Sequence, residues 1–177
     1  MKILVLSDSH CFNENLKRII TKYKNQIDIF IHCGDSSLPI HDPLLTSFNI
    51  VVKGNHDIDN FPHYIKYHNI CITHGHLYNV YAGYDELIQL CKKLDCHICF
   101  HGHTHVPTYQ IHHNIHFINP GSIMMNRGTY GYGTYAIITL TNHHLSVKFY
   151  NSENDSLCNQ NILEEGLELL EEFKKYV

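Results

Sequence analysis

The sequence has no tryptophan, only two arginines and no long apolar run. Its apolar runs fall far short of the roughly 18 residues needed to span a bilayer, which excludes a membrane-spanning helix. Arg18 and Arg127 are the only arginines and the formal net charge is -4, so the basic stripe expected of a duplex-DNA-binding protein is missing. Residues 1–6 lead into Ser7 without a small-residue cleavage site, so we expect no signal peptide.

The charged fraction is also low, at 17%, whereas 44% of the residues are hydrophobic, and this combination excludes an intrinsically disordered chain. A length of 177 residues suggests one domain, which at this size buries roughly 70% of the surface of the unfolded chain. We therefore predict a single domain over residues 1–177. The seven cysteines are an odd number without a secretory context, which favours reduced thiols and a cytoplasmic location.

Histidine is the abundant residue type. There are 17 histidines, as many as aspartate and glutamate together, and this number justifies a search for metal sites. Four of them lie in strand-and-turn contexts typical of solvated surface: His112, His113, His143 and His144.

The pattern of apolar residues predicts an α/β fold. Helices are predicted over 13–24, 84–94 and 162–176, where apolar residues recur at helical spacing. Strands are predicted over 2–6, 27–32, 50–53, 64–67, 69–73, 96–101, 108–112, 116–119, 134–141 and 144–150. The first half alternates strand and helix, which implies parallel strands, and the second half is rich in hairpins. We therefore expect mixed sheets with helices outside.

Polar residues that bind metals recur where the predicted strands end. The five segments are Asp8-Ser9-His10, Gly34-Asp35, Gly54-Asn55-His56-Asp57, His74-Gly75-His76 and Gly102-His103-Thr104-His105. In an open α/β sheet, ligands bind beyond the carboxyl ends of the strands, so five strand ends could converge on one site.

The spacing within these segments suits a pair of ions. Residues two apart in an extended segment point the same way, about 6–7 Å apart at Cα, as in Asp8/His10 and His103/His105. Each such pair could serve one ion, or two ions that lie about 3.5–4 Å apart in dinuclear hydrolytic sites. The donors are carboxylate, imidazole and amide oxygen without thiolate, which favours Mn, Fe, Zn, Ni or Co.

In this order the five segments resemble those of the calcineurin-like metallophosphoesterases, and among these the small single-domain bacterial and archaeal phosphodiesterases. The resemblance covers roughly residues 1–140 and includes the block Asn119-Pro120-Gly121-Ser122. It implies a four-layer αββα sandwich of two mixed β-sheets flanked by helices, with the C-terminal helix, about 162–176, packed on the domain.

The resemblance also implies a ligand set for two divalent transition-metal ions, manganese first, with Ni, Co, Fe or Zn as alternatives. The first ion takes Asp8, His10 and His105, the second takes Asn55, His74 and His103, and Asp35 bridges both. The reaction implied is hydrolysis of a small phosphodiester by a hydroxide that bridges the metals.

Two further residues are catalytic by the same resemblance. His56 faces the substrate and protonates or stabilises the leaving oxygen, and Asp57 orients the His56 imidazole. Arg127 could contact a phosphate or be a solvated surface arginine, and His76 could line the cleft. Cys11 stands where many members of the family have glycine.

Some patterns have simpler interpretations. Cys96 and Cys99 have the spacing of a zinc or redox pair, but positions three apart in a strand face opposite sides, which favours structural cysteines. The apolar stripe of residues 162–176 is typical of core packing or a dimer contact, and its other face is acidic, which anionic lipid would repel.

Two other functions are compatible with the family. The retromer scaffold subunit resembles this fold and acts through protein contacts, but positions equivalent to Asn55 and His56 are altered in that branch. Larger relatives cut DNA or RNA, but the few arginines and the net negative charge argue against a long nucleic acid. We expect a small phosphodiester as partner, no membrane, and a homodimer by analogy with related small phosphodiesterases.

Overall fold

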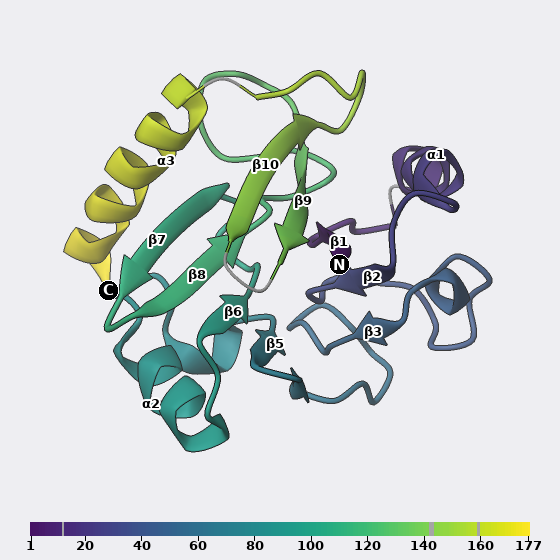
Figure 1. Cartoon of the computed structure of the whole chain (residues 1–177). Coiled ribbons are helices and arrows are strands. Elements are labelled where there is room, and N and C mark those ends of the chain that lie inside the picture. The colour runs from purple at the N-terminus through teal and green to yellow at the C-terminus, as the bar shows by residue number, and fades with distance from the viewer. Residues whose placement is uncertain (12, 142–143, 159) are drawn as a thin grey trace.

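The structure is a computed structural model that describes residues 1–11, 13–141, 144–158 and 160–177. It contains two mixed five-stranded sheets, and the first has the order β10-β9-β1-β2-β3 (Figure 1). In this sheet β1, β2 and β3 run parallel, and β9 pairs antiparallel with both β1 and β10. The strands are β1 (Lys2–Leu6), β2 (Ile29–His32), β3 (Ile50–Val51), β9 (Thr134–Leu140) and β10 (Leu145–Asn151).

The second sheet has the order β4-β5-β6-β8-β7. Its three central strands β5, β6 and β8 run parallel, while β4 and β7 pair antiparallel at the two edges. The strands are β4 (Tyr64–Tyr67), β5 (Ile70–Thr73), β6 (Ile98–Phe100), β7 (Thr108–His112) and β8 (Ile115–Asn119). The parallel strands of both sheets direct their carboxyl ends to one edge of the molecule.

The core between the sheets explains why β1 is apolar throughout. Ile3 and Val5 face the second sheet and belong to the core between the sheets, whereas Leu4 and Leu6 face outward and pack under α1. Successive side chains of a strand point to opposite faces, so a strand covered on both faces needs apolar residues at every position.

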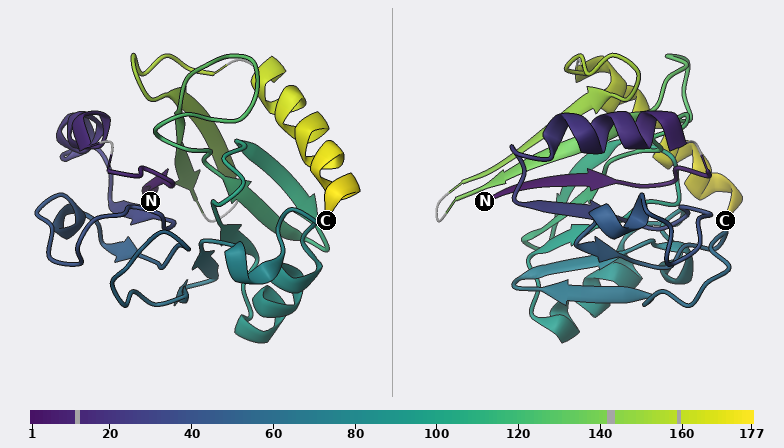
Figure 2. Two further views of the ribbon diagram at one scale, coloured as in Figure 1. Left: turned by 180° about the vertical axis from the view of Figure 1, so that it is seen from behind. Right: turned by 90° about the vertical axis from the view of Figure 1, so that its right-hand side faces the viewer.

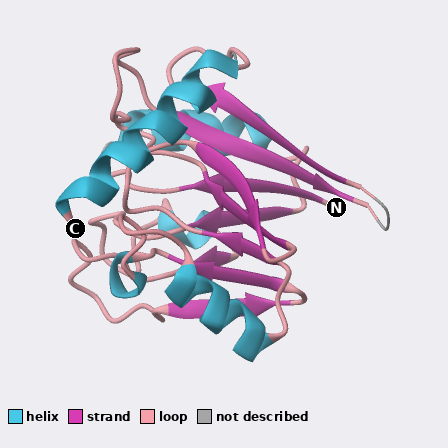
Figure 3. Ribbon diagram, turned by 90° about the vertical axis from the view of Figure 1, so that its left-hand side faces the viewer, coloured by secondary structure: helices cyan, strands magenta, loops and turns pink. Residues whose placement is uncertain are grey.

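Helices cover the outer faces of the two sheets. Helix α1 (Asn13–Tyr23) packs Leu16 and Ile19 on the first sheet, and α2 (Asp85–Leu94) packs Leu87 and Cys91 on the second. Figure 2 shows α1 and α2 on opposite sides of the stacked sheets, and Figure 3 shows the strands stacked between the helices. The predicted four-layer sandwich is confirmed.

The last helix lies along β7. Helix α3 (Gln160–Phe173) continues as a 3₁₀ turn over Lys174–Tyr176, and its Leu163 packs against the core between the sheets. Its close approach depends on Gly166, because a Cβ there would come within 2.8 Å of the Pro107 carbonyl oxygen. Within the described residues, no helix has the length and apolar character needed to cross a membrane.

Two details differ from the sequence predictions. Strand β6 begins at Ile98, after a turn in which Asp95 has a φ of 52°, so Cys96 lies outside the strand. The prediction that Cys96 and Cys99 face opposite sides was therefore wrong, and both are buried in the same cluster under α2. All seven cysteines are free. His112, His113 and His144 are exposed as expected, and His143 lies outside the described residues.

Candidate metal centre

Every predicted metal ligand lies in a loop that follows a parallel strand. Asp8 and His10 follow β1, Asp35 follows β2 and Asn55 follows β3, all in the first sheet. From the second sheet, His74 follows β5 directly, and His103 and His105 follow β6. The centre is therefore built across the junction of the two sheets.

One group consists of Asp8, His10 and His105, whose ligand atoms all lie within 4.8 Å of one another. The Nε2 atoms of His10 and His105 are 3.3 Å apart, and Nε2 of His105 is 3.2 Å from Oδ1 of Asp8. Two imidazole nitrogens and one carboxylate oxygen thus point at the same small volume.

A second group consists of Asp8, Asp35 and His74, all three of them buried. Nε2 of His74 lies 3.3 Å from Oδ2 of Asp35, 3.8 Å from Oδ1 of Asp8 and 3.2 Å from Oδ1 of Asn55. The other ring nitrogen of His74, Nδ1, lies 2.7 Å from the Cys33 carbonyl oxygen, to which it donates. This bond leaves Nε2 free to act as a ligand.

His103 completes the set of seven. Its ring centroid is 5.1 Å from that of His74, and its backbone N–H donates to Oδ2 of Asp8 at 3.2 Å. The two groups share Asp8, and all seven residues predicted from the sequence lie at this one edge of the sheets.

The ligand loops have an uncommon backbone conformation. Five of the seven residues have positive φ, in a region that residues other than glycine seldom adopt: Asp8 (54°), His10 (44°), Asp35 (56°), His103 (71°) and His105 (56°). Each such conformation costs about 1–3 kcal/mol, and strain of this kind clusters at functional sites. The fold therefore holds these side chains in position at a cost in stability.

Two glycines allow the loops to come this close. A Cβ on Gly54 would lie 2.0 Å from Oδ1 of Asp35, and a Cβ on Gly102 would lie 1.9 Å from Oγ of Ser7. The block that begins at Asn119 also supports the loops. The Asn119 amide donates to the Gly102 carbonyl at 3.0 Å, and the Ser122 hydroxyl donates to the Asp8 carbonyl at 2.8 Å.

Burial and mutual proximity have opposite effects on the charges of these groups. Burial alone would raise the pKa of Asp8 and of Asp35, but the His74 imidazole helps to hold both below the usual range. Burial would likewise lower the pKa of His74, but the carboxylates of Asp8 and Asp35 raise it. Burial, reinforced by His74, lowers the pKa of His103 to about 4, so this ring is neutral near pH 7.

The donor set fits divalent cations. Oδ1 of Asp8 is buried without a hydrogen-bond donor among the described residues, although two imidazole nitrogens face it. The ring nitrogens and carboxylate oxygens direct their lone pairs into one small volume. A cation placed there can bind several of these lone pairs at once, whereas a proton can join only two of the atoms. Imidazole, carboxylate and amide donors suit divalent transition metals.

Comparison with known proteins decides the family. Residues 1–143 match the calcineurin-like phosphoesterase superfamily domain. The chain belongs to this superfamily. It is 32% identical over 162 residues to the probable metallophosphoesterase YsnB of Bacillus subtilis, with 89% of this chain and 95% of YsnB covered. The resemblance inferred from the sequence is therefore confirmed. Membership of this family implies that the chain is a phosphoesterase that uses divalent metal ions.

Solved structures agree with this assignment. A conserved protein of Streptococcus pneumoniae, described as a predicted phosphoesterase, has a TM-score of 0.78 at 32% identity, with 86% of this chain and 90% of that chain covered. Vps29 of Entamoeba histolytica with zinc (TM-score 0.68, 22% identity, 89% and 96% covered) and an archaeal phosphodiesterase (0.65, 22%, 84% and 99%) are also similar. At these lower identities the likeness shows the fold alone.

His56 lies at the open side of this calcineurin-like site. It is exposed, its ring meets that of His10 edge-on at 5.2 Å between centroids, and its backbone N–H donates to Oδ1 of Asp35 at 2.7 Å. The imidazole is thus beside the metal ligands, where an incoming ester can reach it.

Asp57 has partners other than the one expected for it. Its Oδ2 accepts the backbone N–H groups of Asp35 and Gly54, both at 2.8 Å. Its Oδ1 accepts the Ser36 hydroxyl at 3.0 Å and the Ser37 N–H at 2.8 Å. Among the described residues these four donors fill the carboxylate, so Asp57 joins the loops after β2 and β3 and does not orient the His56 ring.

The structure adds Tyr81, which the sequence analysis missed. Its ring lies 5.2 Å from that of His103, and its hydroxyl donates to the His103 carbonyl at 3.2 Å. The Arg127 guanidinium lies over the rings of Tyr81 and Phe173 at 5.7 and 5.3 Å, and the Arg127 backbone N–H donates to the His105 carbonyl. Tyr81 lies in a connecting segment without periodicity, so no sequence signal could have found it.

The remaining singled-out residues also flank the centre. The His76 ring is 5.3 Å from that of His74 and 6.1 Å from that of His103, so it lines the site. Cys11 is exposed, and its thiol donates to the Ser37 carbonyl at 3.2 Å.

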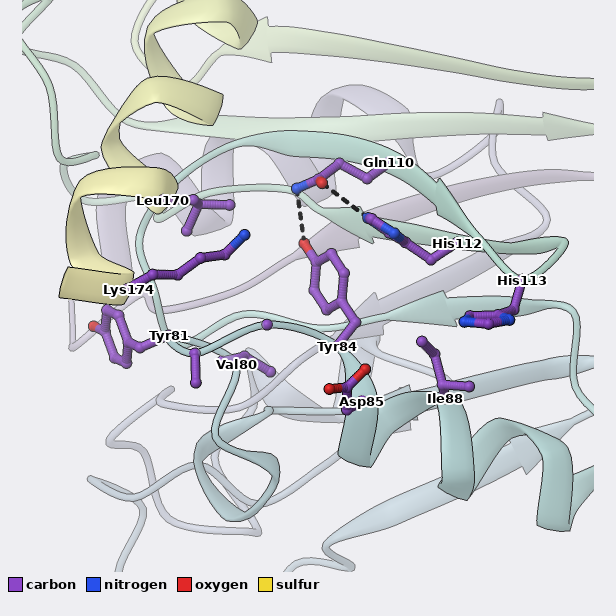
Figure 4. A pocket seen from close by; sticks show the side chains of 12 residues that line it. Val80, Tyr81, Tyr84, Asp85, Ile88, Gln110, His112, His113, Leu170 and Lys174 are labelled. Carbon is purple, nitrogen blue, oxygen red and sulfur yellow. Dashed lines mark hydrogen bonds between the residues drawn. The ribbon is translucent and has the colours of Figure 1, made fainter. Parts of the chain in front are cut away.

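A separate cavity of about 250 Å³ lies beyond Tyr81 (Figure 4). Tyr84, Gln110 and His112 form a chain of hydrogen bonds along one wall, and Lys174 lies on the other. None of the seven predicted ligand residues lines this cavity. Tyr81 lines the cavity and also contacts His103 of the metal centre.

Proposed function

We propose that this phosphoesterase hydrolyses a small phosphodiester with the help of two divalent transition-metal ions. Asp8, His10 and His105 hold the first ion, Asn55, His74 and His103 hold the second, and Asp35 bridges them. The observation that carries the proposal is that two groups of ligand atoms adjoin each other: Asp8 lies in both, and Oδ2 of Asp35 is 3.3 Å from Nε2 of His74. Two adjoining groups of nitrogen and oxygen donors suit a dinuclear centre.

The charges favour an anionic ester. Two divalent ions contribute +4 and the carboxylates of Asp8 and Asp35 contribute -2, which leaves +2 for substrate and nucleophile. When bound, such ions polarise phosphoryl oxygens and lower the pKa of a coordinated water. Manganese is our first choice, and Ni, Co, Fe and Zn suit the same donors.

His56 acts on the leaving oxygen in this proposal. Its exposed ring lies against His10, at the rim of the site, so it can reach an ester oxygen and give it a proton. Arg127 is held beside the site by Tyr81 and Phe173, where its guanidinium can bind a second phosphoryl oxygen.

The proposed substrate is small. The chain has two arginines and a net charge of -4, and one of these arginines, Arg18, is engaged with Asp155. A net negative charge disfavours binding of a long nucleic acid or an anionic membrane. We further propose a cytoplasmic location and a homodimer.

The test is hydrolysis of bis-p-nitrophenyl phosphate by metal-stripped protein reloaded with Mn²⁺, compared with p-nitrophenyl phosphate. We expect turnover of the diester that needs metal and exceeds that of the monoester. His56→Ala should reduce kcat at least about a hundredfold, as loss of one acid–base group does, while His113→Ala, at an exposed turn, serves as the matched control. Preference for the monoester, no turnover with Mn, Ni, Co or Zn, or equal loss in both variants would contradict the proposal.

A further inference from the structure

Three thiols meet in the layer between α2 and the second sheet. Cys71 on β5 and Cys99 on β6 are direct partners in the parallel register, and Cys91 comes down on them from α2. All three side chains are fully buried, and their sulfur atoms all lie within 4.8 Å of one another. We call these residues the thiol triad.

We propose that the thiol triad of Cys71, Cys91 and Cys99 binds one soft monovalent metal ion, Cu⁺, through three thiolates. Thiolates select soft ions such as Cu⁺. Metal–sulfur bonds of about 2.3 Å place three sulfurs around one ion about 4 Å apart. The triad already approaches this separation, so small side-chain movements would close it around an ion.

The coordination number favours Cu⁺ over Zn²⁺. Zinc in proteins is almost always bound by four ligands. Among the described residues, no fourth histidine, cysteine or carboxylate ligand atom joins the three sulfurs within the same 4.8 Å. Three sulfur donors in a dry apolar layer suit a three-coordinate ion.

The three thiols shift one another's pKa. Hydrogen bonds from Cys71 and Cys99 lower the pKa of Cys91, although burial opposes this. The contacts with Cys91, together with burial, raise the pKa of Cys71 and of Cys99. A thiolate buried among apolar groups is costly, and a cation beside it offsets part of that cost.

Apolar and aromatic side chains surround the triad. Leu87, Phe117 and Tyr84 belong to the same cluster, and the Tyr84 ring stacks on Phe117 at 4.4 Å between centroids. Cys96, which is buried, lies where α2 ends, next to exposed His97, and burial, reinforced by Cys91, raises the pKa of the Cys96 thiol.

Binding involves no change of oxidation state. Cu⁺ enters as Cu⁺, the thiols that bind it release their protons to solvent, and three copper–sulfur bonds form. This site is independent of the phosphoesterase centre, whose donors are nitrogen and oxygen, so the two proposals can fail separately.

The experiment uses anaerobic, reduced protein in which Cys11→Ser and Cys158→Ser remove the two thiols outside the buried core. Cu⁺ is supplied as its coloured bicinchoninate complex, and loss of colour measures the ion withheld by the protein. We expect one equivalent of Cu⁺ per chain and an X-ray absorption spectrum with three sulfur neighbours at about 2.3 Å. Cys91→Ala and Cys99→Ala should each bind at least about a hundredfold more weakly, since even outer partners of a metal ligand are worth 10–100-fold.

Cys33→Ala is the matched control, because Cys33 is equally buried but lies in the core between the sheets. Circular dichroism verifies that each variant is folded before it is titrated. Unchanged Cu⁺ affinity in Cys91→Ala and Cys99→Ala, equal loss in Cys33→Ala, tighter retention of Zn²⁺ than Cu⁺, or a disulfide within the triad that forms in preference to binding the ion would each overturn the proposal.

Discussion

Oδ2 of Asp57 accepts the backbone N–H of Asp35 at 2.8 Å. A residue outside the proposed ligand set thus fixes the loop that carries Asp35, the carboxylate proposed to bridge the two metal ions. The same oxygen accepts the Gly54 N–H, and Oδ1 accepts two more donors. Four donors therefore converge on the Asp57 carboxylate. Each hydrogen bond to a charged acceptor is worth about 1.5–3 kcal/mol.

Asp57→Asn should weaken metal binding without removing a ligand. An asparagine amide would direct its own N–H toward a backbone donor, so the loops after β2 and β3 would separate. We expect the affinity for Mn²⁺ to fall about 10–100-fold, as it does for outer partners of metal ligands, measured by calorimetric titration. Asp59→Asn removes a comparable bond to the Ile40 N–H and should leave affinity unchanged; equal affinity in both variants would show that Asp57 has no such role.

Gly54→Ala should displace Asp35. The added methyl would lie 2.0 Å from Oδ1 of Asp35, far inside contact distance, so the carboxylate must move. We expect at least one of the two ions to be lost, as counted by metal analysis after gel filtration. Two ions retained at full affinity would mean that the loop after β3 can retreat without disturbing the site.

Arg127→Met should act on substrate binding. The variant keeps the packing on Tyr81 and Phe173 but loses the charge that faces the ester. We expect KM for the diester to rise about tenfold, equivalent to about 1.4 kcal/mol, with a smaller change in kcat. Arg18→Met is the control: it breaks the ion pair with Asp155 and should lower Tm but not raise KM.

Stability should depend on pH through Asp155. Its Oδ2 lies 2.5 Å from Nη1 of Arg18 and 2.8 Å from Nζ of Lys22, and its Oδ1 accepts the Tyr135 hydroxyl at 2.9 Å. Burial would raise the pKa of Asp155, but these donors, Arg18 first, lower it below its usual value. A lowered pKa in the folded state means stability that is fully present above the pKa of the unfolded chain, about 3.9, and lost as pH falls through the folded value.

Asp155→Asn should therefore lower Tm at pH 7 and converge with the wild type in acid. Because Arg18 and Lys22 are partly exposed, we expect about 1 kcal/mol, or about 2–4 °C for a chain of this size. Thermal unfolding followed by circular dichroism between pH 7 and pH 3 measures the difference, with Glu153→Gln in the same loop as control. A Tm difference that stays constant down to pH 3 would contradict the assignment.

Local patterns in the sequence predict much of this fold. The strands over 2–6, 64–67 and 108–112 have the predicted bounds, because continuous apolar or alternating residues between turn residues leave few other structures. The ligand loops are predictable for the same reason, since polar residues at the ends of parallel strands meet at one edge.

Features that depend on distant contacts were not predictable. The partners of Asp57 and the contact of Tyr81 with His103 are set by how loops meet, and no periodicity records this. The thiol triad follows from the register of β5 against β6 and from the face that α2 presents, which single segments do not encode. Positive φ at five of the seven predicted ligand residues runs against local preference and is held by the surrounding structure.

Phe173 lies in a segment beyond residue 143, where the match to the family domain ends, yet its ring packs on Tyr81 at 5.5 Å and under the Arg127 guanidinium. The proposed metal ligands all lie within residues 1–143, whereas one of the two rings that hold Arg127 comes from α3. A substitution at Phe173 can therefore move the Arg127 guanidinium while every proposed ligand stays the same.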